Sequence, residues 1–399
     1  MGAHLQPFAT TIFNEMSLLA TRTGSINLGQ GFPDIDGPAE VAEAAVAAIR
    51  GGHNQYPPGP GLPVLRQAVA EHQLRCYGLV HDPDTEVVIT MGATEAIAGA
   101  VLGLCEPGDE VVVMEPYYDS YAATIAMAGA TRRVVTLRAP DFALDPDALA
   151  GAVTPQTRLI LLNSPHNPTG RVLTREELEA VARVCVERDL LAVTDEVYEH
   201  LVYDGRPHIP LATLPGMAER TVTISSHGKT FSFTGWKVGW ACGPADLIAA
   251  VRTAKYFLSY SGATPFQHAA AVALGLPASY YEELAASLAE RRDFLSQGLR
   301  DAGLTTFASQ GTYFVTTDAA SVGATDGVEF CLGLPERVGV VAVPMSVFYD
   351  DPDAGRTLVR FAFCKRPEIL IEAASRLKAL RASGTVSRGD TPPTPRGPE

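Results

Sequence analysis

Short apolar runs alternate with segments of helical periodicity over the first two thirds of the chain. The runs fall at residues 86–90, 110–114, 158–162, 190–194 and 221–224. Continuous apolarity, without strict alternation, is what a parallel sheet covered on both faces requires. Between the third and fourth runs, residues 174–188 carry apolar residues at helical spacing, and Thr174 with Glu177 forms a capping-box signature. This order predicts βαβ units and an α/β fold with a mostly parallel central sheet covered by helices.

The pattern changes near residue 285. A charged helical stretch is followed by shorter, more alternating runs at residues 311–316, 338–343 and 357–363, which predict a smaller α+β domain. We therefore expect four parts, with a disordered Gly/Pro/Ser/Thr-rich tail at the end. They are an N-terminal arm and small-domain segment (1–42), a large domain (43–285), a small C-terminal domain (286–381) and the tail (382–399).

Composition narrows the classes of partner and compartment. The 399 residues include 31 basic and 45 acidic side chains, and the net charge of −14 argues against a nucleic-acid or anionic-membrane partner. Six scattered cysteines without a CxxC pair or a His/Cys ligand spacing predict reduced thiols and no metal. The chain shows no secretory signal pattern and no run of membrane-spanning length, so we expect a cytoplasmic protein.

Lys229 lies in the most informative segment, residues 221–240, TVTISSHGKTFSFTGWKVGW. The apolar run ends in small and polar residues, so the lysine is carried from a strand onto a tight loop that a ligand can approach. A desolvated lysine there loses part of its charge and attacks carbonyl groups as a nucleophile. The alternative is an ordinary solvated surface lysine.

Polar or aromatic residues follow the other predicted strands, at the edge where ligands bind in open parallel sheets. Ala93 and Thr94 open a helix whose N–H groups suit a phosphate, and Tyr118 offers a ring for stacking. Asn167, before a proline, could present its amide to a phenolate oxygen. Asp195 ends a buried strand and would need a cation, such as a protonated pyridine nitrogen. Taken singly, each also fits a structural role: a plain helix start, a core tyrosine, a turn or a capping acid.

Arg360 lies inside an apolar run, LVRFAF. A guanidinium in such a strand needs an anion, and its forked donors fit a substrate carboxylate with two hydrogen bonds. A buried structural ion pair is the alternative.

Together, these segments resemble the class I and II aminotransferases of fold type I from about residue 27 to 380. The branch is that of the kynurenine/glutamine aminotransferases and the actinobacterial N-succinyldiaminopimelate aminotransferases. The motifs are NLGQGFPD (27–34), NQY (54–56), NPTG (167–170), DEVY (195–198), the Lys229 segment and Arg360. The resemblance implies pyridoxal 5'-phosphate as cofactor, amino-acid and 2-oxo-acid substrates, and a homodimer.

The resemblance also implies a role for each matching residue. Lys229 would hold the cofactor as a Schiff base, and Asp195 would pair with its pyridinium. The ring would be enclosed by Tyr118 and Val197, and its phenolate oxygen held by Asn167 and Tyr198. The phosphate would be bound by Ala93, Thr94, Ser226, Lys237 and, from the neighbouring subunit, Tyr56. The substrate α-carboxylate would be bound by Gly31, Asn167 and Arg360.

Two residues of the Lys229 segment are not explained by the family pattern. Position 237 is lysine where many relatives have arginine, which keeps the charge and loses the fork. His227 has no role that the resemblance assigns.

The expected reaction is a ping-pong transamination with a 2-oxo acid, 2-oxoglutarate being the expected acceptor. A cysteine-conjugate β-lyase using the same lysine is the alternative, and a non-enzymatic regulator with this fold is a further one. Substrate choice stays open. Phe13, Met16 and the loop around Tyr56 are predicted to line the side-chain pocket, which would favour kynurenine, phenylalanine or methionine. A succinylated substrate with a distal carboxylate would require a further cation, which the sequence does not place.

Overall fold

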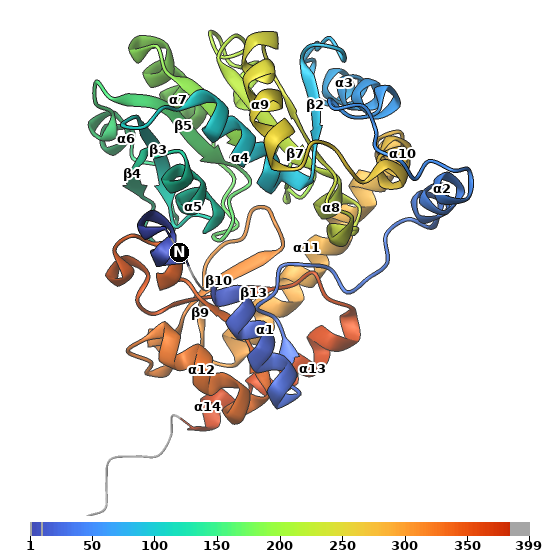
Figure 1. The fold of residues 1–399 in the computed structure, drawn as a ribbon. Helices are drawn as coiled ribbons and strands as arrows, with labels where there is room; N and C mark the ends of the chain where they lie inside the picture. The colour runs from blue at the N-terminus through green and yellow to red at the C-terminus, as the bar shows by residue number, and fades with distance from the viewer. Residues whose placement is uncertain (1, 9–10, 384–399) are drawn as a thin grey trace, which may run out of the picture.

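A seven-stranded sheet forms the centre of the larger part of the molecule in the computed structural model, which describes residues 2–8 and 11–383 (Figure 1). Its strand order is β2-β8-β7-β6-β5-β3-β4. β8 runs antiparallel to both its neighbours, and the remaining pairs are parallel. The mostly parallel α/β fold is therefore confirmed. The strands are β2 (Val87–Thr90), β3 (Glu110–Glu115), β4 (Thr131–Thr136), β5 (Thr157–Asn163), β6 (Leu191–Asp195), β7 (Thr221–Ser226) and β8 (Gly239–Cys242).

All five predicted apolar runs form strands of this sheet, but β4 and β8 were not predicted. β4 is an edge strand with two arginines and partly exposed side chains, so it lacks the continuous apolar pattern of a central strand. β8 is fully buried, yet it follows the glycine-rich turn after Lys229 so closely that its four residues read as part of that turn.

Helices cover both faces of the sheet, as expected. On one face, α4 (Gly92–Leu104), α5 (Ser120–Met127) and α9 (Ala245–Leu258) enclose one apolar cluster with the strands. On the other, α6 (Pro146–Ala152) and α7 (Arg175–Arg188) belong to a larger cluster that continues into the C-terminal part. The predicted capping box of α7 is present, with Thr174 and Glu177 bonded reciprocally.

A third apolar cluster lies at the β2 edge of the sheet. It joins α2 (Ala39–Arg50), α3 (Pro63–Tyr77) and α10 (Thr264–Leu274) to β2 and β8. These helices project to one side of the sheet in Figure 1.

The C-terminal part is built on a four-stranded antiparallel sheet of order β12-β13-β10-β9. Its strands are β9 (Thr305–Thr306), β10 (Phe314–Asp318), β12 (Val343–Pro344) and β13 (Leu358–Ala362). The N-terminal segment joins it, because β1 (Ile26–Asn27) pairs in parallel with β11 (Val340–Val341). The helices of this smaller part are α1 (Ile12–Thr23), α11 (Ala278–Asp301), α12 (Gly327–Val338), α13 (Pro367–Leu377) and α14 (Ala379–Ser383).

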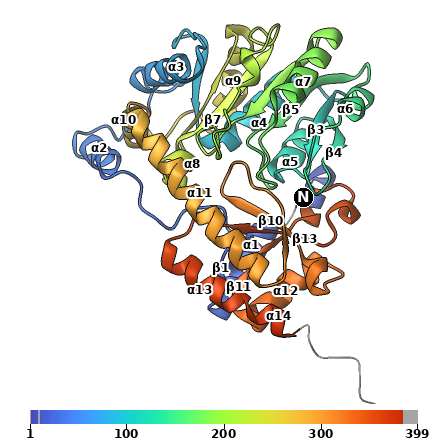
Figure 2. The ribbon, with the colours of Figure 1, turned by 180° about the vertical axis from the view of Figure 1, so that it is seen from behind.

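The long helix α11 runs from beside α10 down to the smaller sheet, as Figure 2 shows. The boundaries predicted for the four parts of the chain stay predictions, and residues 384–399 of the predicted tail lie outside the described residues.

The shorter elements are α8 (His227–Thr230) and the 3-10 turns η1 (Ala3–Phe8), η2 (Leu211–Thr213), η3 (Thr234–Trp236), η4 (Ala319–Val322), η5 (Ser346–Phe348) and η6 (Pro352–Gly355). Within the described residues, no helix is both long and apolar enough to cross a membrane.

Candidate active site

A cavity of about 960 Å³ opens where the carboxyl ends of the parallel strands face the smaller sheet. Twelve of the thirteen predicted site residues line it, although they are drawn from segments more than three hundred residues apart. They are Gly31, Ala93, Thr94, Tyr118, Asn167, Asp195, Val197, Tyr198, Ser226, Lys229, Lys237 and Arg360.

Lys229 lies in α8, the single helical turn that follows β7. Its Nζ atom is 5.9 Å from the centre of the Tyr198 ring. Burial lowers the pKa of Lys229, and the nearby carboxylate of Asp195 opposes that shift. The amine is thus more easily deprotonated than a surface lysine, and the alternative of a solvated surface lysine is wrong.

Asp195 is the last residue of β6 and only 5% exposed. Its Oδ2 atom accepts a hydrogen bond of 2.6 Å from the Tyr121 hydroxyl, and its Oδ1 accepts one of 3.3 Å from the Val197 amide. Burial raises the pKa of Asp195, and these two donors work against that rise. A cationic partner in the cavity would therefore be bound by a carboxylate that is already oriented.

Tyr121 is a residue that the sequence analysis missed. It is fully buried on α5, three positions after Tyr118, and the two rings meet edge-on at 5.8 Å. Tyr118 precedes α5, so helical spacing from Tyr118 did not indicate that Tyr121 would reach Asp195.

The beginning of α4 and the turn before β8 meet in a close backbone contact. A Cβ atom added to Gly239 would lie 2.5 Å from the carbonyl carbon of Gly92, and Gly92 itself has a φ of +74°, so both positions need glycine. The Lys237 side chain reaches over this point, with its Nζ 3.4 Å from where a Gly92 Cβ would stand. The first N–H groups of a helix have no partner within it. Together with the lysine ammonium, those of Ala93 and Thr94 form a positively polarised end of the cavity.

Arg360 lies in β13 and is 1% exposed. Its Nη1 donates to Asn167 Oδ1 at 2.8 Å, and its Nη2 donates to the Gly29 carbonyl at 2.9 Å. In the described part of the chain both acceptors are neutral oxygens, so the alternative of a buried ion pair is wrong. Burial lowers the pKa of Arg360 to about 10, which still leaves it charged at neutral pH. Three rings surround its guanidinium carbon, at 3.9 Å (Phe314), 5.2 Å (Phe13) and 5.5 Å (Phe348).

Gly31 is fixed beside Arg360 by its neighbours. The Tyr313 hydroxyl donates to the Gly31 carbonyl at 2.5 Å, and a Cβ at Gly31 would collide with the Phe314 ring. Tyr313 in turn meets Tyr198 edge-on at 5.2 Å. The backbone of Gly31 therefore lies at the cavity wall with no room for a side chain.

Phe13, Met16 and Tyr56 were expected near the substrate side chain, and the structure places them differently from one another. Phe13 lines the cavity as predicted. Met16 does not, because it is completely buried in the hydrophobic core. Tyr56 is 81% exposed and lies outside the cavity of its own chain. Its predicted reach into a neighbouring subunit stays a prediction.

His227 is a packing residue. It is completely buried and stacks on Phe231, Phe233 and Trp236 at centroid distances of 5.1, 5.6 and 5.5 Å. Neither ring nitrogen has a hydrogen-bond partner among the described residues, and burial lowers the pKa of His227 to about 3. The imidazole is therefore neutral and supports the turn that carries Lys229.

Arg132 was also missed by the sequence analysis. It projects from edge strand β4 into the cavity wall, where its Nε donates to both carboxylate oxygens of Asp350 at 2.9 and 2.8 Å. The Tyr117 hydroxyl also donates to Asp350. Because β4 was not predicted, nothing in the sequence indicated that this arginine would reach the site.

The cavity fits pyridoxal 5'-phosphate, the cofactor that the resemblance implies. An amine with lowered pKa, a buried carboxylate and a positively polarised helix start face one space. These are the groups needed for an aldehyde, a pyridine nitrogen and a phosphate respectively. Lys229, Asp195 and the α4 end would hold these three parts.

Comparison with known proteins gives matches over nearly the whole chain. The family model for class I and II aminotransferases matches residues 23–377. A probable N-succinyldiaminopimelate aminotransferase DapC of Mycobacterium tuberculosis is 56% identical over 95% of this chain and 98% of that protein. The solved structure of N-succinyldiaminopimelate aminotransferase from Mycobacterium tuberculosis has a TM-score of 0.93 and covers 95% of this chain and 100% of its own.

More distant relatives carry other substrate names. A methionine aminotransferase of Escherichia coli is 39% identical, covering 94% of this chain and 97% of that protein. Kynurenine–oxoglutarate transaminase 3 of Mus musculus is 38% identical, covering 93% of this chain and 88% of that protein.

Proposed function

Because the chain belongs to the class I and II aminotransferases, which are pyridoxal phosphate-dependent enzymes, we propose that it transfers the amino group of N-succinyldiaminopimelate to 2-oxoglutarate. The observation that carries this proposal is the 56% identity to the probable N-succinyldiaminopimelate enzyme, spread over 95% of the chain. The methionine and kynurenine relatives are 39% and 38% identical. The family resemblance drawn from the motifs is confirmed by these matches.

Lys229 is the proposed proton carrier. The bound cofactor supplies an electron sink for the negative charge that develops when a substrate loses its Cα proton. A neutral lysine amine beside the substrate can take that proton from Cα and later return one, a role typically worth about 10²–10⁴-fold in rate. The lowered pKa of Lys229 supports this role, because a fully protonated amine cannot accept a proton.

Arg360 is the proposed anchor of the substrate α-carboxylate. Its guanidinium is buried among three aromatic rings and bonded only to neutral oxygens in the described residues. An entering carboxylate would replace the weaker bond to Asn167 with charge-assisted bonds. Asn167 would then be released to hold the cofactor's phenolate oxygen, and the Gly31 backbone would lie against the same carboxylate.

Arg132 supports the choice of a substrate with a second carboxylate. Among the described residues, the cations that line the cavity are Lys229, Lys237, Arg360 and Arg132. The first three have proposed partners, so Arg132 is the group left for a distal succinyl carboxylate. Its side chain is 34% exposed, and Asp350 holds it at the cavity wall through Nε.

The experiment is a panel of amino donors assayed with 2-oxoglutarate. N-succinyldiaminopimelate should give the highest kcat/KM, with glutamate as co-product. A higher kcat/KM with kynurenine or methionine would overturn the proposed substrate. These two donors are the second candidates, because the aromatic rings of Phe13 and Phe348 lie at the cavity wall. Release of pyruvate and a thiol from a cysteine conjugate, without a new amino acid, would instead favour the β-lyase.

We also propose a cytoplasmic homodimer in which Tyr56 reaches the partner's site. Tyr56 contacts Tyr260 edge-on at 6.0 Å, and both belong to an exposed apolar surface together with Phe257 and Leu258. Such a surface favours association. The free cysteines are compatible with a reducing compartment. Light scattering should give twice the chain mass, and a monomer with full activity would contradict the dimer.

A further inference from the structure

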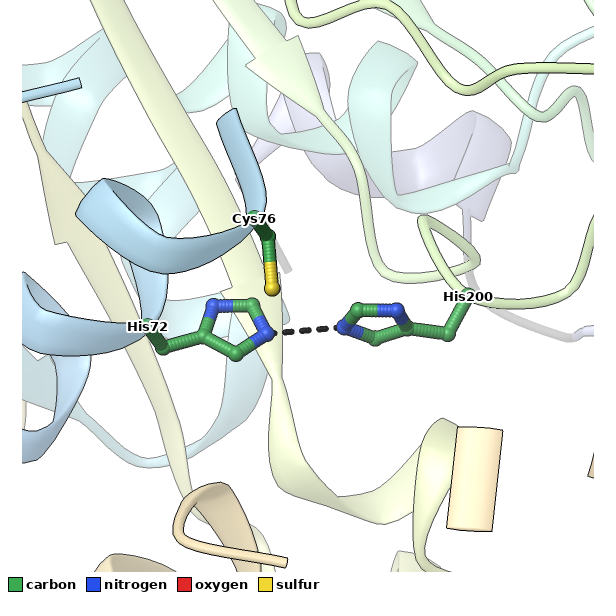
Figure 3. Close-up of side chains that lie close together, drawn as sticks. All are labelled: His72, Cys76 and His200. Atoms are coloured by element: carbon green, nitrogen blue, oxygen red, sulfur yellow. Dashed lines mark hydrogen bonds between the residues drawn. The ribbon is translucent and has the colours of Figure 1, made fainter. Parts of the chain in front are cut away.

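A second group of ligand-type side chains lies outside the cavity. His72 and Cys76 are one helical turn apart on α3, and His200 comes from the loop after β6 (Figure 3). One ligand atom from each of the three lies within 4.8 Å of the others. The two imidazoles face each other, with their Nε2 atoms 2.8 Å apart. None of the three lines the active-site cavity.

The short distance between the His72 and His200 Nε2 atoms requires a bridging group between them. Two neutral rings can share only one proton between their Nε2 atoms, so one nitrogen presents a lone pair to the other. His72 is completely buried, and within the part of the chain that the structure describes its Nδ1 has no hydrogen-bond partner. A proton can therefore bridge the two nitrogens. A metal ion can also do so, because neutral imidazole nitrogens are common metal ligands.

Glu199 places a buried carboxylate next to the pair. It is 4% exposed, and its carboxylate accepts hydrogen bonds from the neutral hydroxyls of Tyr77 at 2.7 Å and Ser225 at 2.5 Å. Among the described residues its ion-pair partner is His200, whose Nε2 is 3.9 Å from Oε2. A buried carboxylate is costly without a cation close by, and a divalent ion at the imidazoles would provide one.

We propose that His72, Cys76 and His200 form a zinc site. Two imidazole nitrogens and one thiolate are ligands that Zn²⁺ prefers, and His72 and Cys76 have the i, i+4 spacing that brings two ligands to one face of a helix. In tetrahedral zinc sites the ligand atoms are ~3.3–3.8 Å apart, given bonds of about 2.0–2.3 Å. To reach that geometry, the two Nε2 atoms, now 2.8 Å apart, would have to separate and the exposed Cys76 side chain would have to turn towards them.

The fourth zinc ligand is a water molecule or the Glu199 carboxylate, since Cys76 opens the site to solvent. Binding would release the Cys76 thiol proton, and the proton between the two imidazoles would move to the Nδ1 atom of the ring that carries it. The ion would tie α3 to the loop after β6, which carries Tyr198, so it would stabilise that loop from outside the cavity. This proposal departs from the expectation of no metal, because the sequence places His200 more than a hundred residues from the helical pair.

The test is zinc binding by the untagged, cofactor-loaded enzyme. After equilibrium dialysis against buffered Zn²⁺, metal analysis should find one ion per chain. Replacement of zinc by Co²⁺ should give the intense visible bands of tetrahedral thiolate ligation. Cys76→Ser and His200→Gln should each weaken binding at least about tenfold. Cys76 is the exposed member, so its variant avoids the risk that a change at buried His72 prevents folding.

The matched control is His53→Gln. His53 and His268 form another close histidine pair, with ring centroids 4.3 Å apart, but no cysteine joins them in the described residues. Zinc binding by this variant should equal that of the parent enzyme. The proposal is overturned if the parent binds no zinc, or if Cys76→Ser binds it as tightly as the parent does.

Discussion

The two ends of the active-site cavity are built differently. At the inner end, Lys229 and Asp195 come directly from the ends of adjacent central strands β7 and β6 and are held by a buried framework. At the outer wall, Phe13 and Arg132 come from an N-terminal helix and an edge strand. The inner end therefore has one possible geometry, whereas the outer wall is assembled from peripheral segments. We therefore propose that chemistry and substrate choice are carried by different parts of the fold.

Lys229→Ala should have the largest effect at the inner end. Without the amine no group is placed to move the Cα proton, so kcat should fall by about 10²–10⁴-fold or more. Steady-state assay with 2-oxoglutarate measures this, and the control is Lys378→Ala, at an exposed lysine that directly follows α13. Substantial transamination by the Lys229 variant would show that the inner end is misassigned.

Asp195→Asn keeps the size of the side chain and removes its charge. We expect kcat to fall by about a hundredfold or more, because the pyridine nitrogen loses the carboxylate that keeps it protonated. Tyr121→Phe removes one donor to the same carboxylate and should cost about tenfold in kcat, the value of one hydrogen bond to a charged group. Equal effects of the two variants would contradict this ranking.

Arg360→Lys should affect binding more than turnover. The substitution keeps the charge and loses the fork, so KM for the amino donor should rise about tenfold or more while kcat changes less. Initial-rate kinetics over a range of donor concentrations separate the two. If kcat fell and KM stayed the same, Arg360 would be acting on the reaction and not on the carboxylate.

His227 allows a smaller test of the framework behind the inner end. Its folded pKa is depressed to about 3, so the unfolded chain binds the proton more readily below its ordinary value of 6.5. The free energy of unfolding should therefore decrease as pH falls below 6.5, by up to about 1.4 kcal/mol per pH unit from this residue. In His227→Phe, denaturant unfolding at pH 5 and pH 7.5 should differ less than in the parent enzyme. An unchanged difference would mean that His227 is not buried as a neutral ring.

The same division separates what could be predicted from the sequence from what could not. Continuous apolar runs indicated the central strands, and the residues at their ends, such as Asp195 and Asn167, carried a local signal. Arg132 had none, because an edge strand lacks the continuous apolar pattern and its place in the cavity depends on tertiary packing. Met16 was misplaced because an apolar residue on α1 faces the core or the cavity according to the rotation of the helix. His200 likewise approaches His72 only through the fold.

The most direct test compares Arg132→Gln with Arg133→Gln, its neighbour on β4 that lies outside the cavity lining. The kcat/KM values of both variants would be measured with N-succinyldiaminopimelate and with methionine. We expect Arg132→Gln to lose about tenfold or more with the succinylated donor, the value of a charged hydrogen bond, and to keep its rate with methionine. Arg133→Gln should match the parent enzyme with both. Equal losses with both donors in Arg132→Gln would contradict a separate outer wall that selects the substrate.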